Sequence, residues 1–130
     1  MNKGFNLVEL IVVLVIVGII ITFAAPQFGV TKERALDKEA KATVALIQAA
    51  ERIYKMEAGF YYPPAASTSV VADINTWLKL DLSAAAPSWT YAVDDSNKRT
   101  TASRKPSGSR VWTLTFSGDT PVCTGTACPP

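Results

Sequence analysis

Glu9 is the residue whose type and position most clearly need a chemical explanation. It is the only charged residue between Phe5 and Phe28, and residues 10–21, which follow it, are uncharged and nearly all apolar. A charged side chain inside a membrane segment costs about 2.5–3.5 kcal/mol on insertion scales, so such a residue usually marks a functional pairing. Glu9 is therefore a candidate for a functional charge pairing.

Cys123 and Cys128 are the other residues with chemically active side chains, and they enclose only the four residues TGTA. If this part of the chain is exported, the pair indicates a disulfide that closes a short C-terminal loop. Gly125 and its small neighbours would let the turn close. A two-ligand metal site is disfavoured because no histidine or nearby acid accompanies the pair. A redox pair is disfavoured because the spacing is not C-x-x-C.

The composition excludes several classes of function. Histidine is absent from the 130 residues, which removes the commonest general base and the commonest metal ligand. Neither a Ser/His/Asp nor a Cys/His arrangement can form, so we expect no enzyme activity, no metal and no cofactor. The formal net charge of +2 argues against bulk nucleic-acid binding as the main role.

Residues 5–28 form an apolar segment that is long enough for a membrane helix, since about 20 apolar residues cross a bilayer core. The segment is rich in Val and Ile, but in lipid the backbone must bond within itself, so a helix is expected. Only Lys3 and the amino terminus precede it, which places the N-terminus in the cytoplasm. Pro26 lacks an amide hydrogen, and we expect it to kink or locally open this helix.

The apolar segment has two plainer interpretations. A secretory signal peptide needs an apolar region of about 7–15 residues and a small-x-small cleavage site. The apolar run here is longer, and FAAPQF is a poor cleavage site. A simple single-span anchor stays open, but it leaves Glu9 unexplained.

Residues 29–58 show a second helical pattern, which is amphipathic. We expect charged residues, among them Asp37 and Glu51, on the face opposite the apolar stripe, with Lys41 and Lys55 paired to them at i+4. The apolar stripe recurs at steps of three or four residues: Leu36, Ala40, Val44, Ile47, Ala50 and Tyr54.

The rest of the chain predicts a small antiparallel sheet. Gly59 is suited to end the helix, and residues 59–87 are expected to be a loop with one helical turn from Asp73 to Leu78, capped by Asp73. Residues 88–130 hold the expected β-meander and the disulfide loop, with strands in SWTYAVDD, RTTASRK and RVWTLTFSG and turns at DDSN and KPSGS. The expected fold class is α+β: a long N-terminal helix, apolar in its first half and amphipathic in its second, packed on three or four antiparallel strands.

The start of the chain resembles a known family. KGFNLVEL, followed by a Val/Ile/Leu stretch that ends in AAPQF, is similar to the class III signal of type IV prepilins and of the pseudopilins of type II secretion. The likeness is firm over residues 1–28 and looser to about residue 64, where AERIYKMEAGFYYPP resembles the segment that leaves the long pilin helix. Asn6 departs from the Thr that the family commonly carries. The matching positions are Gly4, Phe5, Leu7, Glu9, Leu10 and Pro26.

The resemblance implies how the chain is processed and assembled. A prepilin peptidase would remove residues 1–4 by cutting between Gly4 and Phe5, and would methylate the new Phe5 amine. The apolar helix, residues 5–28, would act first as a membrane anchor and then as the core of a filament. In that core Glu9 would meet the Phe5 amine of a neighbouring subunit and set its register, as one buried polar residue does in a coiled coil.

The implied function is that of a structural subunit of an extracellular type IV pilus-like filament, used in adhesion, twitching motility or DNA uptake. The implied partners are further copies in a helical filament, the prepilin peptidase, an inner-membrane assembly platform, and membrane lipid before assembly. The globular head, residues 29–130, would lie in the periplasm until the subunit enters the pilus.

Two alternatives remain: a pseudopilin of a type II secretion system, within a periplasmic pseudopilus, and a bitopic membrane anchor with a small periplasmic binding domain. Asp119 is the only acid after Asp95, which disfavours the acidic calcium-binding loop usual in major pseudopilins. A local basic cluster could contact DNA or an acidic face of the next subunit, or form a solvated hairpin edge that blocks aggregation. Its members are Lys98, Arg99, Arg104, Lys105 and Arg110.

Overall fold

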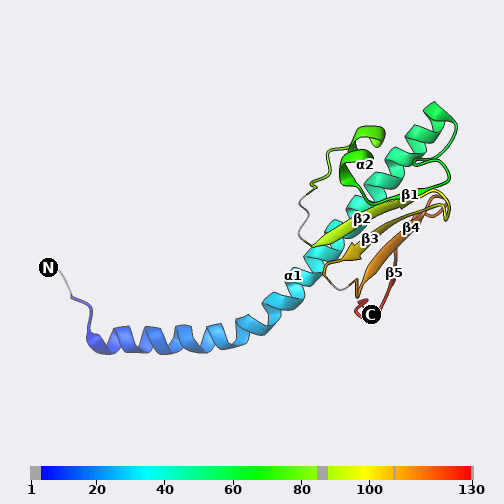
Figure 1. Ribbon diagram of the computed structural model, residues 1–130. Coiled ribbons are helices and arrows are strands. Elements are labelled where there is room, and N and C mark those ends of the chain that lie inside the picture. The colour runs from blue at the N-terminus through cyan, green and yellow to red at the C-terminus, as the bar shows by residue number, and fades with distance from the viewer. Residues whose placement is uncertain (1–3, 85–87, 107, 130) are drawn as a thin grey trace. The chain divides into compact units, whose positions relative to one another are not determined.

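The computed structural model describes residues 4–84, 88–106 and 108–129, without the side chains of residues 24–27. The chain divides into two compact units, Met1–Ala35 and Leu36–Pro130 (Figure 1). The division falls inside the long helix, beyond residue 29, where the globular head was predicted to begin.

Helix α1, Leu7–Ala58, contains 52 residues and covers both predicted helical segments except for Phe5 and Asn6, which precede it. It ends at Gly59, whose N–H donates a hydrogen bond to the carbonyl oxygen of Lys55 at 2.8 Å. Gly59 has a φ of 87°, a conformation that a residue without Cβ adopts at little steric cost. The predicted helix end at this glycine is confirmed.

The second unit contains an antiparallel sheet with the strand order β1-β2-β3-β4-β5, so that strands adjacent in sequence are adjacent in space. The second half of α1 runs along this sheet (Figure 1). A short helix, α2, Val71–Leu78, lies between the first two strands in sequence. The strands are β1 Ser67–Thr68, β2 Trp89–Asp94, β3 Arg99–Arg104, β4 Val111–Thr115 and β5 Val122–Thr124.

The core lies between one face of the sheet and the second half of α1. Along β2 and β4 the buried residues alternate with less buried ones, as expected for strands with one face on a core. Residues paired between neighbouring strands form a row across the sheet, which consists of Tyr91, Ala102, Trp112 and Cys123. The predicted helix stripe packs on this face, with Ala40, Val44, Ile47 and Ala50 buried and Leu36 and Tyr54 partly buried.

The structure confirms the α+β fold, a long helix packed on a small antiparallel sheet, and the three predicted strands are β2, β3 and β4. The described residues hold five strands rather than three or four. The sequence pattern did not predict β1 and β5, because they have only 2 and 3 residues. The predicted helical turn is α2, but the expected cap at Asp73 is wrong. The N-cap is Val70, which makes no side-chain capping hydrogen bond.

The prediction that Asp37 and Glu51 lie on the exposed face of α1 is wrong. Asp37 is 6% exposed and Glu51 is 0% exposed. Both are spaced seven residues from the buried Val44, and an interval of seven residues is close to two helical turns, so the three share the face that meets the sheet. The expected i+4 pairs do not form either, since Lys41 lies over the Trp112 ring and Lys55 over the Tyr61 ring.

Candidate functional site

The predicted cleavage point lies in exposed backbone before the helix. Gly4, Phe5 and Asn6 are irregular and exposed. Asn6 starts α1: its carbonyl oxygen accepts the Glu9 N–H at 3.0 Å, and its side-chain oxygen accepts the Val8 N–H at 3.4 Å, as an N-cap does. The peptide bond between Gly4 and Phe5 is therefore outside the helix, and its cleavage stays a prediction.

Glu9 lies in the first turn of α1 and its side chain is exposed. The free N–H groups of a first turn create a partial positive charge that favours a carboxylate, so local electrostatics support this position. Within the described part of the chain, no cation forms an ion pair with Glu9. The carboxylate is thus open to a partner from another molecule.

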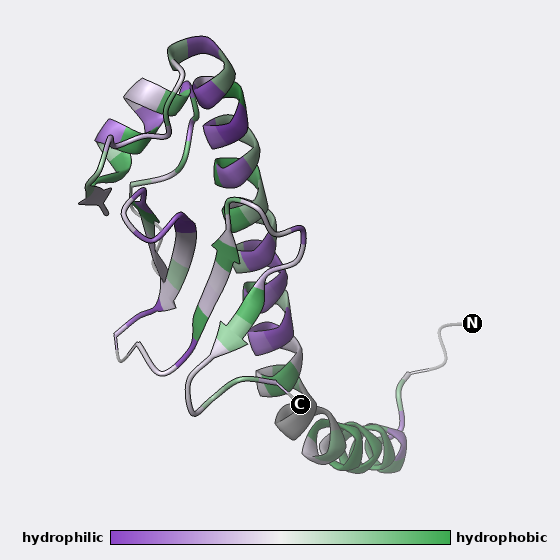
Figure 2. Ribbon diagram, turned by 90° about the vertical axis from the view of Figure 1, so that its right-hand side faces the viewer, coloured by the Kyte–Doolittle hydropathy of each residue, from purple (hydrophilic) through white to green (hydrophobic). Residues whose placement is uncertain are grey.

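The apolar surface around Glu9 is exposed throughout the described part of its helix segment. Every large apolar side chain described between Phe5 and Phe23 is exposed, from 45% at Val17 to 80% at Phe5. Figure 2 shows this half of α1 hydrophobic along its length, whereas the second half alternates between hydrophobic and hydrophilic residues. The Thr22 hydroxyl donates to the Gly18 carbonyl oxygen at 2.9 Å, so it is satisfied inside the helix. A helix that is apolar on all sides is normally buried.

No single helix in the described part of the chain is long and apolar enough for a membrane span. A bent pair, Leu7–Phe23 with Phe28–Ala58, qualifies by length and composition, as a signal sequence also would. Pro26 lies among residues 24–27, whose side chains are outside the description, so its predicted role as a kink is untested.

In the head, Asp37 holds α1 to strand β4 and the residue before it. Its two carboxylate oxygens accept hydrogen bonds from the Arg110 guanidinium at 2.5 Å and from the Trp112 indole N–H at 3.1 Å. The Asp37 and Arg110 side chains are 9% and 10% exposed. The sequence analysis did not predict this buried ion pair. The seven-residue spacing between Asp37 and Val44 did indicate that Asp37 lies on the buried face of the helix.

Glu51 is the second buried carboxyl group on α1 that sequence reasoning missed. One of its oxygens, Oε2, accepts the Tyr62 N–H at 2.9 Å, while Oε1 has no hydrogen-bond partner among the described residues. Burial raises the pKa of Glu51 to about 7, against the opposing effect of the Tyr62 hydrogen bond and with a further rise from Asp95. The side chain is therefore a buried group that titrates near neutral pH.

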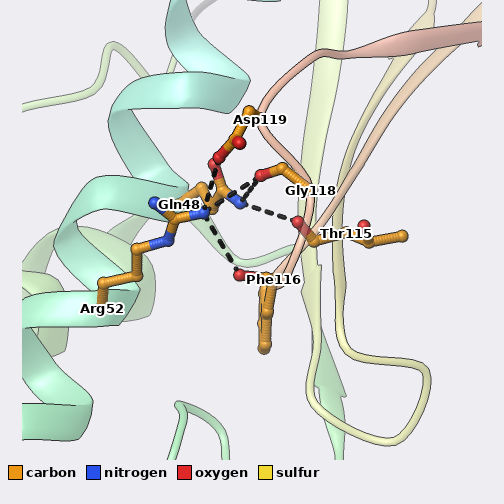
Figure 3. A network of polar contacts seen from close by, with 6 residues as sticks. All are labelled: Gln48, Arg52, Thr115, Phe116, Gly118 and Asp119. Atoms are coloured by element: carbon orange, nitrogen blue, oxygen red, sulfur yellow. Dashed lines mark hydrogen bonds and ion pairs between the residues drawn. The ribbon is translucent and has the colours of Figure 1, made fainter.

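Two polar side chains of α1 hold the turn after β4 (Figure 3). Gln48 donates from Nε2 to the carbonyl oxygens of Thr115 and Gly118, at 2.7 Å each. Arg52 donates to the Gly118 carbonyl at 3.0 Å and lies 3.4 Å from the Asp119 carboxylate. Asp119 thus has a cationic partner from its own chain.

The C-terminal loop is closed as predicted. Cys123 and Cys128 form a disulfide, with their Cα atoms 5.8 Å apart. Gly125 within this loop has a φ of 122°, and a Cβ at this position would lie 2.3 Å from the Ser109 carbonyl oxygen. The loop therefore requires a glycine both for its backbone conformation and for its close approach to Ser109.

The predicted basic cluster is engaged within the head. The fold places acids beside it, from the end of β2, from the turn that follows β2 and from α1, which leaves less free charge for DNA. Lys98 pairs with Asp95, Arg99 with Asp94 at 3.5 Å and Arg110 with Asp37, while Arg104 lies over the Trp89 ring at 5.5 Å.

An apolar hollow of about 310 Å³ lies between α1 and α2 in the head. Trp77 of α2, which is 53% exposed, faces it beside Leu46 and Ile53 of α1, which are 50% and 54% exposed. The ion pair between Glu57 and Lys79, at 3.6 Å, lies at its edge.

Comparisons with models of protein families, with curated proteins and with solved structures found no match to this chain. Its function is therefore inferred from its own residues and their geometry, together with the resemblance of its first residues to a prepilin signal.

Proposed function

We propose that this chain is a structural subunit of a type IV pilus-like extracellular filament, held in the inner membrane by α1 before assembly. The observation that carries the proposal is the first half of α1, whose large apolar side chains between Phe5 and Phe23 are all exposed and whose single charge, Glu9, stands in the first turn. The resemblance of the same residues to a class III signal supports the same role.

The exposed apolar surface requires a nonpolar environment. Fully burying one Val, Leu, Ile or Phe side chain stabilises by about 1.5–3 kcal/mol, and the segment presents such side chains along its whole length. A contiguous apolar surface of this kind marks a membrane or a protein–protein contact. Lipid would satisfy it before assembly, and helices of further copies would satisfy it in a filament.

Apolar side chains alone do not explain why the helices leave lipid for each other. Lipid tails are as apolar as leucine, so helices in a membrane associate through close packing and polar contacts. Glu9 supplies such a contact, because a carboxylate in nonpolar surroundings is strongly stabilised by a cation and is costly without one. Removal of residues 1–4 would create that cation, the amine of Phe5, on every copy.

The head is consistent with a position outside the cytoplasm. The disulfide between Cys123 and Cys128 is of a kind that persists in oxidising compartments. The periplasm and the cell exterior are such compartments, in agreement with an exported head on a membrane-anchored helix.

The proposal is tested by Glu9→Gln, which removes the charge and keeps the size, with Glu39→Gln on the exposed face of the same helix as a matched control. We expect sheared wild-type and Glu39→Gln cells to yield fibres, and Glu9→Gln cells to yield at least tenfold less fibre protein. Mass spectrometry should find N-termini at Phe5 with one added methyl group.

Three outcomes would contradict the proposal. A normal fibre yield from Glu9→Gln would show that assembly does not need the negative charge of Glu9. A Phe5 N-terminus without any extracellular fibre would favour the pseudopilin of a type II secretion system. A chain that keeps Met1, or is cut elsewhere, would favour a bitopic anchor with a periplasmic domain.

A further inference from the structure

Residues 59–66, here named the aromatic loop, are held to the head by two carboxyl groups from different elements. Glu51 of α1 accepts the Tyr62 N–H at 2.9 Å. Asp95, in the turn after β2, accepts the Ala65 N–H at 2.8 Å and donates its own N–H to the Ala66 carbonyl at 2.9 Å. The position of the loop therefore depends on the state of both side chains.

The two carboxyl groups have opposite electrostatic environments. Burial raises the pKa of Asp95, but hydrogen bonds from Lys98 and from the Ala65 N–H, together with the Lys98 charge, outweigh it and hold the pKa below its ordinary value. Glu51 is fully buried and forms no ion pair among the described residues. Asp95 thus stays ionised at neutral pH, whereas an ionised Glu51 has no cation to offset its loss of solvent.

Other charged or titratable groups near Glu51 do not supply that cation. On α1, Lys55 lies over the Tyr61 ring at 4.4 Å. From the turn after β2, Lys98 pairs with Asp95 and lies 5.7 Å from the same ring. Burial raises the pKa of Tyr62, and nearby Asp73 of α2, Tyr54 of α1 and Glu51 raise it further, so Tyr62 stays neutral at physiological pH.

The aromatic loop shapes the surface beside the apolar hollow. The Tyr62 ring stacks on Trp77 of α2, with ring centroids 5.7 Å apart, and meets Tyr54 of α1 edge to face at 6.1 Å. Tyr62 is 8% exposed, whereas Trp77 is 53% exposed. Moving the loop would withdraw the ring that supports Trp77 and would expose the Tyr54 side of α1.

We propose that Glu51 is a proton-operated latch: its neutral form holds the aromatic loop on α1, and loss of its proton to solvent loosens the loop and changes the aromatic surface around Trp77. The asymmetry of the two anchors carries this inference, since one carboxyl group has a cation and the other has an unpartnered oxygen in the described structure. The latch does not depend on the proposed role in a filament.

Hydrogen exchange of the full chain in detergent micelles, followed by mass spectrometry between pH 5.5 and pH 8.5, tests the latch. After correction for intrinsic exchange, we expect protection of the aromatic loop to fall about tenfold from pH 6 to pH 8 and then to level off, because each pH unit between the open-state pKa near 4.5 and the closed-state pKa near 7 weakens the closed state tenfold. Peptides from β3 should keep their protection. Glu51→Gln should abolish the change, and Glu57→Gln, an exposed glutamate of the same helix, should retain it.

The latch is overturned if the wild-type loop shows no pH-dependent protection or if Glu51→Gln keeps the same transition. Should Glu51→Gln fail to fold, NMR of the wild-type chain with ¹³C-labelled glutamate carboxyl carbons decides the matter. One carboxyl signal titrating near pH 7 together with the loop transition supports the latch, and titration of every glutamate near pH 4.5 refutes it.

Discussion

Asp37→Ala should be among the most destabilising single substitutions in the head. The substitution removes the acceptor of both the Arg110 guanidinium and the Trp112 indole N–H. The Arg110 side chain is only 10% exposed, so water cannot fully replace the lost carboxylate. The charge of Arg110 would then remain in a largely dry site.

The expected loss follows from the burial of the pair. Removing one partner of a buried ion pair costs about 3–5 kcal/mol, because the other charge is left uncompensated. For a domain of about 100 residues, 1 kcal/mol lowers the unfolding midpoint by about 4–8 °C. Asp37→Ala should therefore lower the midpoint of the head by at least about 12 °C. Replacing both partners, as Asp37→Leu with Arg110→Met, should recover much of this loss.

The assay is thermal unfolding of the full chain in detergent, followed by the fluorescence of the buried Trp89 and Trp112. Asp119→Ala is the matched control, because the Arg52–Asp119 pair has side chains that are 46% and 88% exposed. Exposed pairs contribute about 0–1 kcal/mol, so this variant should stay within about 8 °C of the wild type. An Asp37→Ala midpoint inside the same limit would refute the reasoning.

Two further predictions concern the C-terminal loop and Glu51. Gly125→Ala forces an alanine to a φ of 122° with its Cβ 2.3 Å from the Ser109 carbonyl oxygen, and it should destabilise the head by about 1–3 kcal/mol. Gly29→Ala is the control, because a Cβ there meets nothing within 4 Å. Equal unfolding midpoints for the two variants would contradict this prediction. Because the folded pKa of Glu51 is raised from 4.5 to about 7, the native state holds a proton that the unfolded chain loses, so the free energy of unfolding should fall between pH 4.5 and pH 7 by at most about 3 kcal/mol. Denaturant titrations at several pH values give the free energy of unfolding as a function of pH. This free energy should change less between pH 4.5 and pH 7 in Glu51→Gln than in the wild type, and an equal change in both would count against the raised pKa.

The sequence predicted the fold class because its strongest patterns reflect burial. The alternation of Trp89, Tyr91 and Val93 places three apolar side chains on one side of a strand, and these residues are buried in β2. Such a pattern needs several residues to be visible. β1 and β5 have only 2 and 3 residues, and they are strands because a neighbouring strand pairs with them rather than because of their own sequence.

The buried carboxyl groups could not be recognised from residue type. Asp and Glu are almost never fully buried unless paired, so assigning Asp37 and Glu51 to the solvent face followed the usual composition of an amphipathic helix. What buries Asp37 is Arg110, which lies 73 residues away in the sequence. A partner at that distance leaves no local pattern. The periodicity relative to Val44 did mark both positions, and it conflicted with their charge.

The acids of the basic cluster, in contrast, lie close to their cations in the sequence, since Lys98 is three residues from Asp95. The cluster was defined by its cations alone, which left out Asp94 and Asp95 at the predicted DDSN turn just before it. A turn brings the two groups together, with Lys98 on Asp95 and Arg99 3.5 Å from Asp94. Net charge along a segment therefore overstated the charge that this surface offers to a partner.

Three carboxyl groups of α1 can be compared to show why the proposed role of Glu9 in assembly is physically reasonable. Asp37 is buried and is neutralised by a cation from its own chain. Glu51 is buried where no cation reaches it among the described residues, so the remaining way to avoid a buried charge is to keep its proton. Glu9 has no cation in the described chain either, but it is exposed within an apolar surface. Once lipid or other helices cover that surface, the carboxylate faces the same cost as the other two. Unlike Glu51, it can be reached by a second molecule, so a cation from another copy is the means of compensation that its position allows.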